Sequence, residues 1–249
     1  MIKKKISIII PTLNCVTTLN ETLVSIFNQN NKNFELIIID GDSNDGTIKI
    51  IKKYSHLVDH WISEKDEGIY DAINKGIKIT SFDYYLIVGS DDVLFDNAVD
   101  IYINNINENI DIITANIIFK EKIQSLKKGP IWLHGPQNLI VGHTIACLIN
   151  KKLHDIYGYY TLDLIVAADT YFLLKIIRGS CKIRYCKDIV GKIGAEGISN
   201  KRYFKMTYEH MLAQIRTGSN VFIQLNLMII KQIYFFVRYF VVRNFFNKN

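Results

Sequence analysis

The first hundred residues alternate short apolar runs with segments of helical spacing. Runs of strand length are ISIII, FELIIID, DHWIS and YYLIV, and a later run is DIITANIIF. The segments between the first four carry apolar residues three or four positions apart, as in Leu19, Leu23, Ile26 and Phe27. Because the strand-length runs are apolar on both faces, we expect an α/β fold with a mostly parallel sheet covered by helices on each side.

A polar loop follows each of the first four predicted strands. These loops read PTLN, DGDSNDG, EKDEG and GSDD. In an open parallel sheet the ligand crevice lies outside the carboxyl ends of the strands, so the four loops can line one cleft. The candidate residues are Thr12, Asn14, Asp40, Asp42, Asp45, Asp66, Asp91 and Asp92. Such residues are also common in turns and caps, which explains a single loop better than four in succession.

The segment EGIYDAINKGI predicts a helix with one packing face and one polar face. Its apolar stripe consists of Ile69, Ala72, Ile73 and Ile77. Asp71 and Lys75 stand four positions apart on another face, and Asp66 precedes the helix, where a carboxylate is favoured by about 0.3–1 kcal/mol. Asn74 and Lys75 have two interpretations. They are surface residues, or they lie at the cleft and meet a diphosphate, with the lysine as a point charge.

The paired carboxylates of GSDD predict a metal site. Asp91 and Asp92 repel each other at the end of a buried strand, and Mg²⁺ or Mn²⁺ would relieve that repulsion while keeping coordination positions for phosphate oxygens. A metal that binds diphosphate implies a nucleotide-linked substrate, because the metal neutralises charge on the leaving group. The alternative is a helix N-cap within SDDVLFDNAV.

Composition is consistent with an intracellular globular protein. A chain of 249 residues that is 49% hydrophobic suits one large α/β domain, alone or with an appendage. Its four cysteines lack CxxC spacing and secreted-domain density, so we expect reduced thiols in the cytoplasm. The apolar run in MIKKKISIII stops at Pro11, too early for a signal-peptide core, and is expected to be a strand.

Positive charge is concentrated in the last fifty residues. Of the net charge of +6, residues 201–249 carry +7, from eight cations against Glu209 alone, which leaves −1 for residues 1–200. The cations alternate with apolar and aromatic residues in NLMIIKQIYFFVRYFVVRNFF. This composition favours an anionic membrane surface over nucleic acid, since no nucleic-acid motif accompanies it.

The same segment predicts an amphipathic helix. Gln224, Lys231 and Arg238 recur every seven positions and therefore stay near one face. A spanning helix needs about 20 nearly uninterrupted apolar residues, and the cations interrupt this one, so we expect it to lie in the membrane interface. The alternative is a terminal helix that packs on the domain itself.

Taken in order, ISIIIPTLN, ELIIIDGDSNDGT, EKDEGIYDAINKGI and GSDD resemble the family 2 glycosyltransferases of bacterial polysaccharide and O-antigen assembly, which have the GT-A fold. The likeness is strong over about residues 5–100. The segments VGHTIACLINKKLH, IVAADTYFLLKI and GAEGIS extend it more loosely to about residue 200. It implies a nucleotide-sugar half at 1–100, an acceptor half at 101–200 and a basic helical tail at 201–249.

The resemblance also implies roles on the donor side. The first nucleotide-contacting loop is matched by Pro11, Thr12 and Asn14. Asp40 matches the acidic residue beside the base, and Asp91 and Asp92 match the metal motif, with Asp92 as the direct ligand. The chain departs from the family pattern at Gly89, where many members have an acidic residue, and at Gly41, where many have a second Asp.

On the acceptor side the resemblance makes Asp169 the catalytic base. A carboxylate suits this role because a sugar hydroxyl must lose its proton as it attacks the anomeric carbon. The alternative is an exposed polar position in AADTYFLLKI. His143, in GHT, matches a histidine often found in the family, and it either contacts the acceptor or a phosphate or is structural. His56 and His60 are interpreted as a surface pair.

We therefore expect an inverting, Mn²⁺- or Mg²⁺-dependent glycosyltransferase, peripheral at the inner face of the cell membrane. It would move a sugar from a nucleotide-diphosphate donor, foremost a UDP-sugar, to a lipid-linked saccharide; inversion and the acceptor class come from the resemblance. One alternative is a sugar nucleotidyltransferase, which needs a Gly-rich, basic first loop that PTLNCVTTLN is not. The other is a non-catalytic, membrane-bound saccharide-binding module, which needs no carboxylates.

Overall fold

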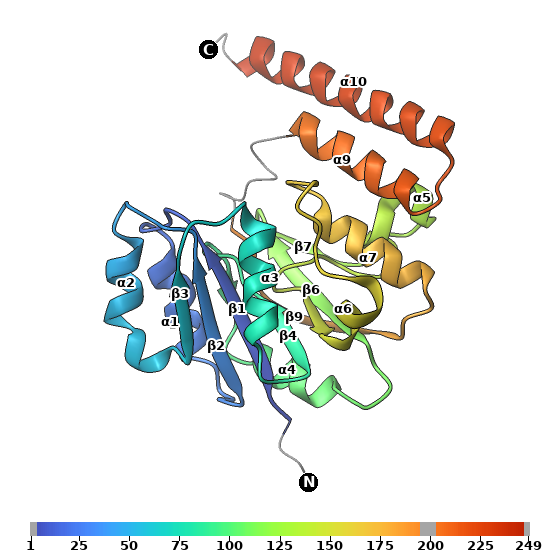
Figure 1. The fold of residues 1–249 in the computed structure, drawn as a ribbon. Helices are drawn as coiled ribbons and strands as arrows, with labels where there is room; N and C mark the ends of the chain where they lie inside the picture. Colours follow the sequence, from blue (N-terminus) through green and yellow to red (C-terminus); the bar gives the residue numbers. More distant parts are fainter. Residues whose placement is uncertain (1–3, 195–202, 247–249) are drawn as a thin grey trace.

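The structure is a computed structural model that describes residues 4–194 and 203–246 (Figure 1). Its first half is a parallel sheet with the strand order β3-β2-β1-β4. These strands are β1 (Ile6–Thr12), β2 (Phe34–Asp40), β3 (His60–Ser63) and β4 (Tyr84–Ile87). The helices between them are α1 (Leu19–Phe27), α2 (Thr47–Lys53) and α3 (Ile69–Ile79), with a 3₁₀ turn η1 (Ser55–Leu57). The predicted alternation of strands and helices is confirmed.

The second half continues the same sheet with mixed strand directions. From β4 the order runs β8-β6-β9-β5, and β7 pairs with β6. β8 is antiparallel to both β4 and β6, whereas β6 and β9 are parallel. The strands are β5 (Val93–Leu94), β6 (Ile112–Phe119), β7 (Lys122–Gln124), β8 (Cys147–Asn150) and β9 (Ile183–Lys192). The helical elements are α4 (Ala98–Asn105), α5 (Ile131–His134), η2 (Gly135–Asn138), α6 (Lys152–Tyr157), α7 (Ala168–Arg178), α9 (Tyr203–Arg216) and α10 (Val221–Phe246).

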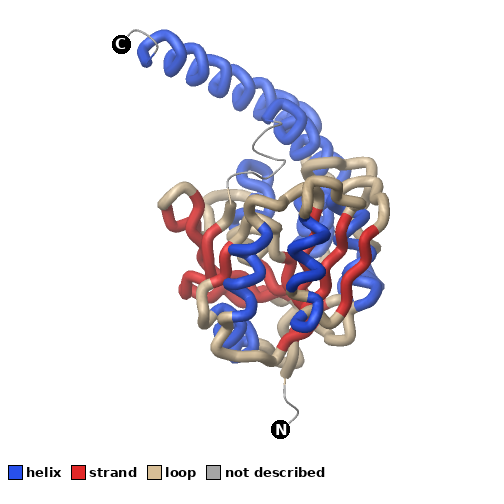
Figure 2. Tube along the Cα trace, turned by 90° about the vertical axis from the view of Figure 1, so that its left-hand side faces the viewer, coloured by secondary structure: helices blue, strands red, loops and turns tan. Residues whose placement is uncertain are grey.

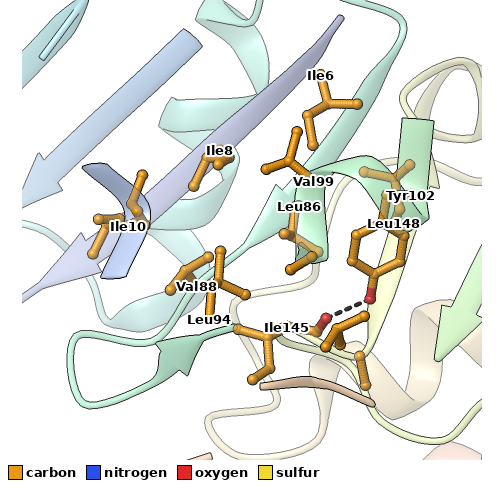
Figure 3. Close-up of a cluster of buried hydrophobic side chains, with 14 of the residues drawn as sticks. Ile6, Ile8, Ile10, Leu86, Val88, Leu94, Val99, Tyr102, Ile145 and Leu148 are labelled. Carbon is orange, nitrogen blue, oxygen red and sulfur yellow. Dashed lines mark hydrogen bonds between the residues drawn. The ribbon is translucent and has the colours of Figure 1, made fainter. Parts of the chain in front are cut away.

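The sheet has an apolar core on each face because successive side chains of a strand point to opposite sides. Ile8 and Ile10 of β1 belong to the core that α1 and α4 cover, and Ile9 belongs to the core that α3 covers. Figure 3 shows the first of these cores, in which the Tyr102 hydroxyl donates a hydrogen bond to the carbonyl oxygen of Ile145, 2.5 Å away. This two-sided burial explains why the strand segments are apolar throughout.

Close packing of α3 on the sheet depends on Gly76. A Cβ atom at this position would lie 2.6 Å from Cγ2 of Ile9 on β1, which is shorter than van der Waals contact. The absent side chain therefore lets the helix backbone approach the strand. This approach brings the N-terminal end of α3, with Tyr70, to the carboxyl ends of the strands.

The helices α9 and α10 lie beyond the carboxyl ends of β1 and β2, at the opposite end of the molecule from the N-terminus (Figures 1 and 2). α9 packs against α7, and α10 packs against α9. The Tyr203 and Phe235 rings stack with their centroids 3.9 Å apart. Within the described ranges, no helix combines the length and the apolar character needed to cross a membrane.

Candidate active site

Asp40 joins the carboxyl ends of the first three strands. It is the last residue of β2, it is fully buried, and its carboxylate accepts four hydrogen bonds. Thr12 Oγ1 and Ser43 Oγ donate to Oδ1 at 3.0 and 2.6 Å, and the Ser43 N–H and Ser63 Oγ donate to Oδ2 at 2.9 and 2.8 Å. Asp40, expected beside the base, therefore organises the three loops from beneath.

The first two loops are also linked to each other. Asn14 and Asp42 have positive φ angles of 49° and 66°, a conformation that Asn and Asp tolerate better than most residues. The Asn14 N–H donates to Ser43 Oγ at 2.8 Å, and its Oδ1 accepts from the Asn44 N–H at 3.0 Å. Both Asn14 and Asp42 are exposed, whereas Pro11 and Thr12 are buried below them. A bound ligand can therefore reach the tips of these loops but not the strand ends below them.

Asp66 meets the second loop at Gly41. A Cβ atom at Gly41 would lie 2.4 Å from Asp66 Oδ2, so the departure from the family pattern at this position makes room for the Asp66 carboxylate. Asp66 Oδ1 accepts a hydrogen bond from the Gly68 N–H at 2.9 Å, which fixes the turn into α3. The loops after β1, β2 and β3 thus converge, as expected.

Two residues of α3 are engaged by the protein itself. Asn74 is buried and bonds the backbone of Tyr160 at both amide atoms, donating to its carbonyl oxygen at 2.8 Å and accepting from its N–H at 3.0 Å. Lys75 Nζ lies 2.8 Å from Glu64 Oε1 and 3.2 Å from Asp71 Oδ2. These contacts give both residues a structural role, with Asn74 tying α3 to the second half of the chain, and a contact of either residue with a diphosphate stays a prediction.

The two carboxylates of GSDD have different environments. Asp92 is buried, and its oxygens accept hydrogen bonds from the Gly89 and Gly194 N–H groups at 2.9 and 3.0 Å. The pKa of Asp92 is raised to about 6, chiefly by burial and also by the Asp91 charge, against the opposing effect of the two N–H groups. Asp91 is only half-buried. Asp92, expected as the direct metal ligand, is committed to the backbone, and Asp91 is the more accessible of the two.

A helix does begin within SDDVLFDNAV, but its N-cap is Asn97, so the alternative that the GSDD carboxylates cap a helix is wrong. The residues that follow form the short strand β5, which pairs with β9, and α4 begins only at Ala98. A Cβ atom at Gly89 would lie 2.9 Å from Asp92 Oδ2, so the glycine leaves room for that carboxylate beside its own N–H.

Asp169 lies in the first turn of α7, on the other side of the site. Its Oδ1 accepts from the Thr170 N–H at 2.7 Å and lies 3.0 Å from the Tyr70 hydroxyl of α3. Its Oδ2 lies 3.9 Å from Nδ1 of His143, and its side chain is 24% exposed. The neighbour of His143, Thr144, lies beside Asp92. The predicted base and the GSDD loop are therefore brought together by the segment GHT.

A buried chain of hydrogen bonds sets the tautomer of His143. His154 Nδ1 lies 3.1 Å from the carbonyl oxygen of Gly158 and must donate to it. Burial lowers the pKa of His154 to about 4, so its Nε2 carries no proton and accepts from the Tyr85 hydroxyl at 2.7 Å. Tyr85 in turn accepts from Tyr160 at 2.9 Å.

This chain of hydrogen bonds ends at His143. Since the Tyr160 proton is used toward Tyr85, the Tyr160 oxygen accepts from Nε2–H of His143 at 2.7 Å. Burial lowers the pKa of His143, although the Asp169 charge opposes the shift, so the imidazole is neutral. Its Nδ1 is then a bare acceptor that faces Asp169 Oδ2. Two acceptors 3.9 Å apart can share the proton of one incoming hydroxyl group.

Glu209 of α9 holds the segment that carries Asp169. It is 3% exposed, and its Oε2 accepts from the N–H groups of Val166 and Ala167 at 2.7 and 3.1 Å. We did not expect this role from the sequence, although a lone acidic residue in a basic segment was a signal for it. Tyr70, Tyr85, Tyr160 and His154 were also missed, because aromatic residues among apolar ones are typical of a core.

The chain belongs to the family described as Glycosyl transferase family 2, whose model matches residues 7–164. The family membership and the GT-A fold expected from the motifs are thereby confirmed.

Two curated relatives illustrate the range of the family. The poly(ribitol-phosphate) beta-N-acetylglucosaminyltransferase TarP of Staphylococcus aureus is 37% identical over 132 residues, which is 51% of this chain and 40% of that protein. The dolichyl N-acetyl-alpha-D-glucosaminyl phosphate 3-beta-D-2,3-diacetamido-2,3-dideoxy-beta-D-glucuronosyltransferase of Methanococcus voltae is 25% identical over 244 residues, 86% of this chain and 74% of that protein. The chain matches less than half the length of the first relative.

Solved structures share the fold. Residues 1–349 of S. aureus TarS in complex with UDP-GlcNAc superpose with a TM-score of 0.67 at 17% identity, over 90% of this chain and 70% of that one. The mannosyltransferase PcManGT of Pyrobaculum calidifontis, in complex with GDP-Man and Mn²⁺, gives a TM-score of 0.67 at 15% identity, over 93% and 70% of the two chains. At these identities the likeness concerns the fold.

The hydrogen-bond chain predicts the effect of Tyr160→Phe. Loss of the hydroxyl frees Nε2–H of His143 and leaves Tyr85 without its donor, which should cost about 1–3 kcal/mol of stability. We expect ¹⁵N NMR of the histidine rings to show His143 as a fixed Nε2–H tautomer in the wild type and as a mixture in the variant. Tyr159→Phe, on the exposed neighbouring ring, is the matched control. An unchanged tautomer in Tyr160→Phe would contradict the assignment.

Proposed function

We propose that this chain is an inverting glycosyltransferase that moves a sugar from a UDP-sugar to a lipid-linked saccharide in bacterial surface polysaccharide synthesis. The observation that carries the proposal is the position of Asp169, where one carboxylate oxygen is held by Tyr70 and a backbone N–H and the other faces neutral His143. Family membership supports sugar transfer. The UDP-GlcNAc complex of TarS, which has the same fold, supports the donor class.

The arrangement suits general base catalysis. A sugar hydroxyl of the acceptor would donate its proton to Asp169 Oδ2. His143 Nδ1 would share this hydrogen bond as a second acceptor and so orient the hydroxyl group. As the hydroxyl oxygen bonds to the anomeric carbon from the face opposite the leaving group, the proton passes to Asp169 and the nucleotide diphosphate departs. Direct displacement of this kind inverts the anomeric configuration.

The donor would lie over the convergent loops. We assign its contacts to Asn14, Asp42 and Asp66, with Pro11 and Thr12, which are buried, supporting the loop below Asn14. The exposed loop tips Asn14 and Asp42 lie above the Asp40 carboxylate, which holds their loops in place. Loops that are already fixed in this way reduce the ordering cost of binding.

A divalent metal fits beside Asp91 better than beside Asp92. Asp91 is a half-buried carboxylate that could be a metal ligand, whereas the oxygens of buried Asp92 accept hydrogen bonds from backbone N–H groups. Among residues 4–194 and 203–246 no three His, Cys, Asp or Glu side chains are grouped to hold a metal. Mn²⁺ or Mg²⁺ would therefore be held by Asp91 together with the donor diphosphate. When bound, the ion would neutralise charge on the leaving group.

The C-terminal helix would attach the enzyme to the inner face of the cell membrane. Two of its glutamines face the protein: Gln224 is buried and donates to the Trp132 carbonyl at 2.8 Å, and Gln232 Nε2 lies 3.4 Å from the Thr207 hydroxyl. Its apolar side chains face outward, with Phe222 77% and Ile230 61% exposed. A helix with its apolar side turned away from the protein is suited to an interface with lipid.

The first test of the function is Asp169→Asn. Asparagine keeps the contacts of Oδ1 but cannot take the proton, so transfer should fall about 10²- to 10⁴-fold while UDP affinity stays unchanged. Transfer is measured as UDP release from UDP-GlcNAc in the presence of a lipid-linked saccharide, and NMR of the product gives its anomeric configuration. Asp163→Asn, an exposed carboxylate paired with Arg216, is the control. Full transfer by Asp169→Asn, or retention of configuration, would refute the mechanism.

The metal assignment predicts different outcomes for two neighbouring substitutions. Asp91→Asn should abolish the gain in UDP affinity that Mn²⁺ gives, because it removes the accessible ligand. Asp92→Asn should instead lower the melting temperature, because an amide nitrogen would face one of the two N–H donors. Calorimetric titration with UDP, with Mn²⁺ or with chelator, and thermal unfolding separate the two effects. Wild-type behaviour of Asp91→Asn with Mn²⁺ would remove Asp91 from the metal site.

Vesicle binding tests the orientation of α10. The chain should pellet with phosphatidylglycerol vesicles at low salt and less with phosphatidylcholine, since each cation near an anionic leaflet contributes about 1 kcal/mol. Phe222→Glu/Ile230→Glu should reduce binding at least about 10-fold, because two exposed apolar anchors are lost. Ile156→Glu, at a residue 67% exposed on α6, should have no effect. Equal binding by all three proteins would show that α10 does not contact lipid.

A further inference from the structure

A cavity of about 380 Å³ lies between α5, η2, α7, α9 and α10, apart from the donor loops. This volume is within the range of small-ligand pockets. Its walls are fixed by side-chain amides: Gln214 of α9 donates to the carbonyl oxygen of Ile131 at 2.7 Å, and Gln224 of α10 donates to that of Trp132 at 2.8 Å. The cavity is therefore formed by the docking of the two terminal helices on the acceptor half.

The walls are positively charged. They include Lys127 and Lys231 and contain neither Asp nor Glu, while burial lowers the pKa of His210, which also lines the cavity. Burial lowers the pKa of Lys231, and the neighbouring charge of Lys127 lowers it further. Across residues 4–194 and 203–246, neither lysine takes part in an ion pair. Two ammonium groups that disfavour each other in a cavity without a carboxylate indicate a site for an anion.

The nearest carboxylates do not supply the missing charge. Asp169 and Glu209 both act on the pKa of His210, but neither lines the cavity. Glu209 Oε2 accepts from the Val166 and Ala167 N–H groups, and Oε1 lies 3.8 Å from Lys205 Nζ. The two lysines line the cavity without a carboxylate beside them and are also open to solvent, so an anion that enters the cavity can reach both.

One part of the cavity wall is apolar. It is formed by Leu133, Tyr203, Met206, Met211, Leu227 and Met228. Methionine side chains adapt to flexible chains, so this wall suits a hydrocarbon. The wall also includes Thr170, the residue next to Asp169, whose hydroxyl lies 3.3 Å from His210 Nε2. A ligand here would therefore have a charged group and an apolar chain, and would lie beside the proposed base.

We propose that this cavity binds the diphosphate group of a lipid-linked acceptor, with Lys127 and Lys231 as its ligands and the apolar wall receiving the first part of the lipid chain. The inference rests on the proposed function and deepens it by naming the group through which the acceptor is recognised. The outward apolar face of α10 places the cavity next to the lipid surface from which such an acceptor would come.

The test is calorimetric titration of the full chain with geranyl diphosphate, below its micelle concentration, without vesicles. Chelator and saturating UDP are present, so that the diphosphate does not occupy the donor site. Lys127→Gln and Lys231→Gln should each weaken binding about 10-fold, as expected for the loss of one charged hydrogen bond, and the double variant should weaken it further. The control is Lys128→Gln, at an exposed lysine outside the cavity wall, which should bind as the wild type does.

Two further ligands show whether the cavity recognises a lipid diphosphate or a free phosphate. Inorganic diphosphate and geraniol should each bind at least about 10-fold more weakly than geranyl diphosphate, because each lacks one half of the recognised group. If inorganic diphosphate binds as tightly as geranyl diphosphate, the site takes free phosphates and not a lipid headgroup, which overturns the proposal. Equal affinity of the wild type and the double variant also overturns it. Thermal unfolding of each variant confirms that the fold is intact.

This experiment fails independently of the proposed function. Sugar transfer that depends on Asp169, together with no lysine-dependent binding of geranyl diphosphate, would refute the cavity alone. Lysine-dependent binding without any transfer from UDP-GlcNAc would support the cavity and refute the donor and the reaction.

Discussion

The site depends on one buried carboxylate, that of Asp40. A carboxylate removed from water is costly unless hydrogen bonds replace its hydration, and here four donors from three loops do so. Because the donors come from β1, from the loop after β2 and from β3, the same interaction that stabilises the charge also fixes the three loops relative to one another. The exposed tips Asn14 and Asp42 are held in place because their loops are fixed in this way.

Glu209 has the corresponding function on the acceptor side. It is buried, and it holds the backbone just before α7, the helix that begins with Asp169. α9, which lies beyond residue 200, therefore holds a segment of the preceding half, and the division of the chain at residue 200 stays a prediction. Within the basic segment 201–249 the structure describes two helices: α9 holds the backbone before the proposed base, and α10 packs on α9 through Phe235, which stacks on Tyr203, and through Gln232 beside Thr207.

The tautomer of His143 follows from an atom far from the proposed reaction. The Gly158 carbonyl fixes the proton of His154, and each hydroxyl passes the direction of its hydrogen bond to the next group until Nε2–H of His143 is reached. These hydrogen bonds cross the core from His154 of α6 to Tyr85 of β4 and end at His143 in the segment GHT. Orientation by a buried network costs no rearrangement during a reaction, which is the advantage of a pre-organised site.

The sequence by itself determined the alternation of strands and helices in the first hundred residues, the convergence of the loops after β1, β2 and β3, the family and the fold class. These features follow from local periodicity and from motifs of a few residues, and local patterns survive in one dimension. The tertiary structure decided the roles of individual side chains. Asp92 is bound by Gly194, 102 residues away, Asn74 by Tyr160, 86 residues away, and Glu209 by Val166, 43 residues away. A hydrogen bond depends on geometry to within a few tenths of an ångström, and spacing along the chain carries no such information for residues that only folding brings together.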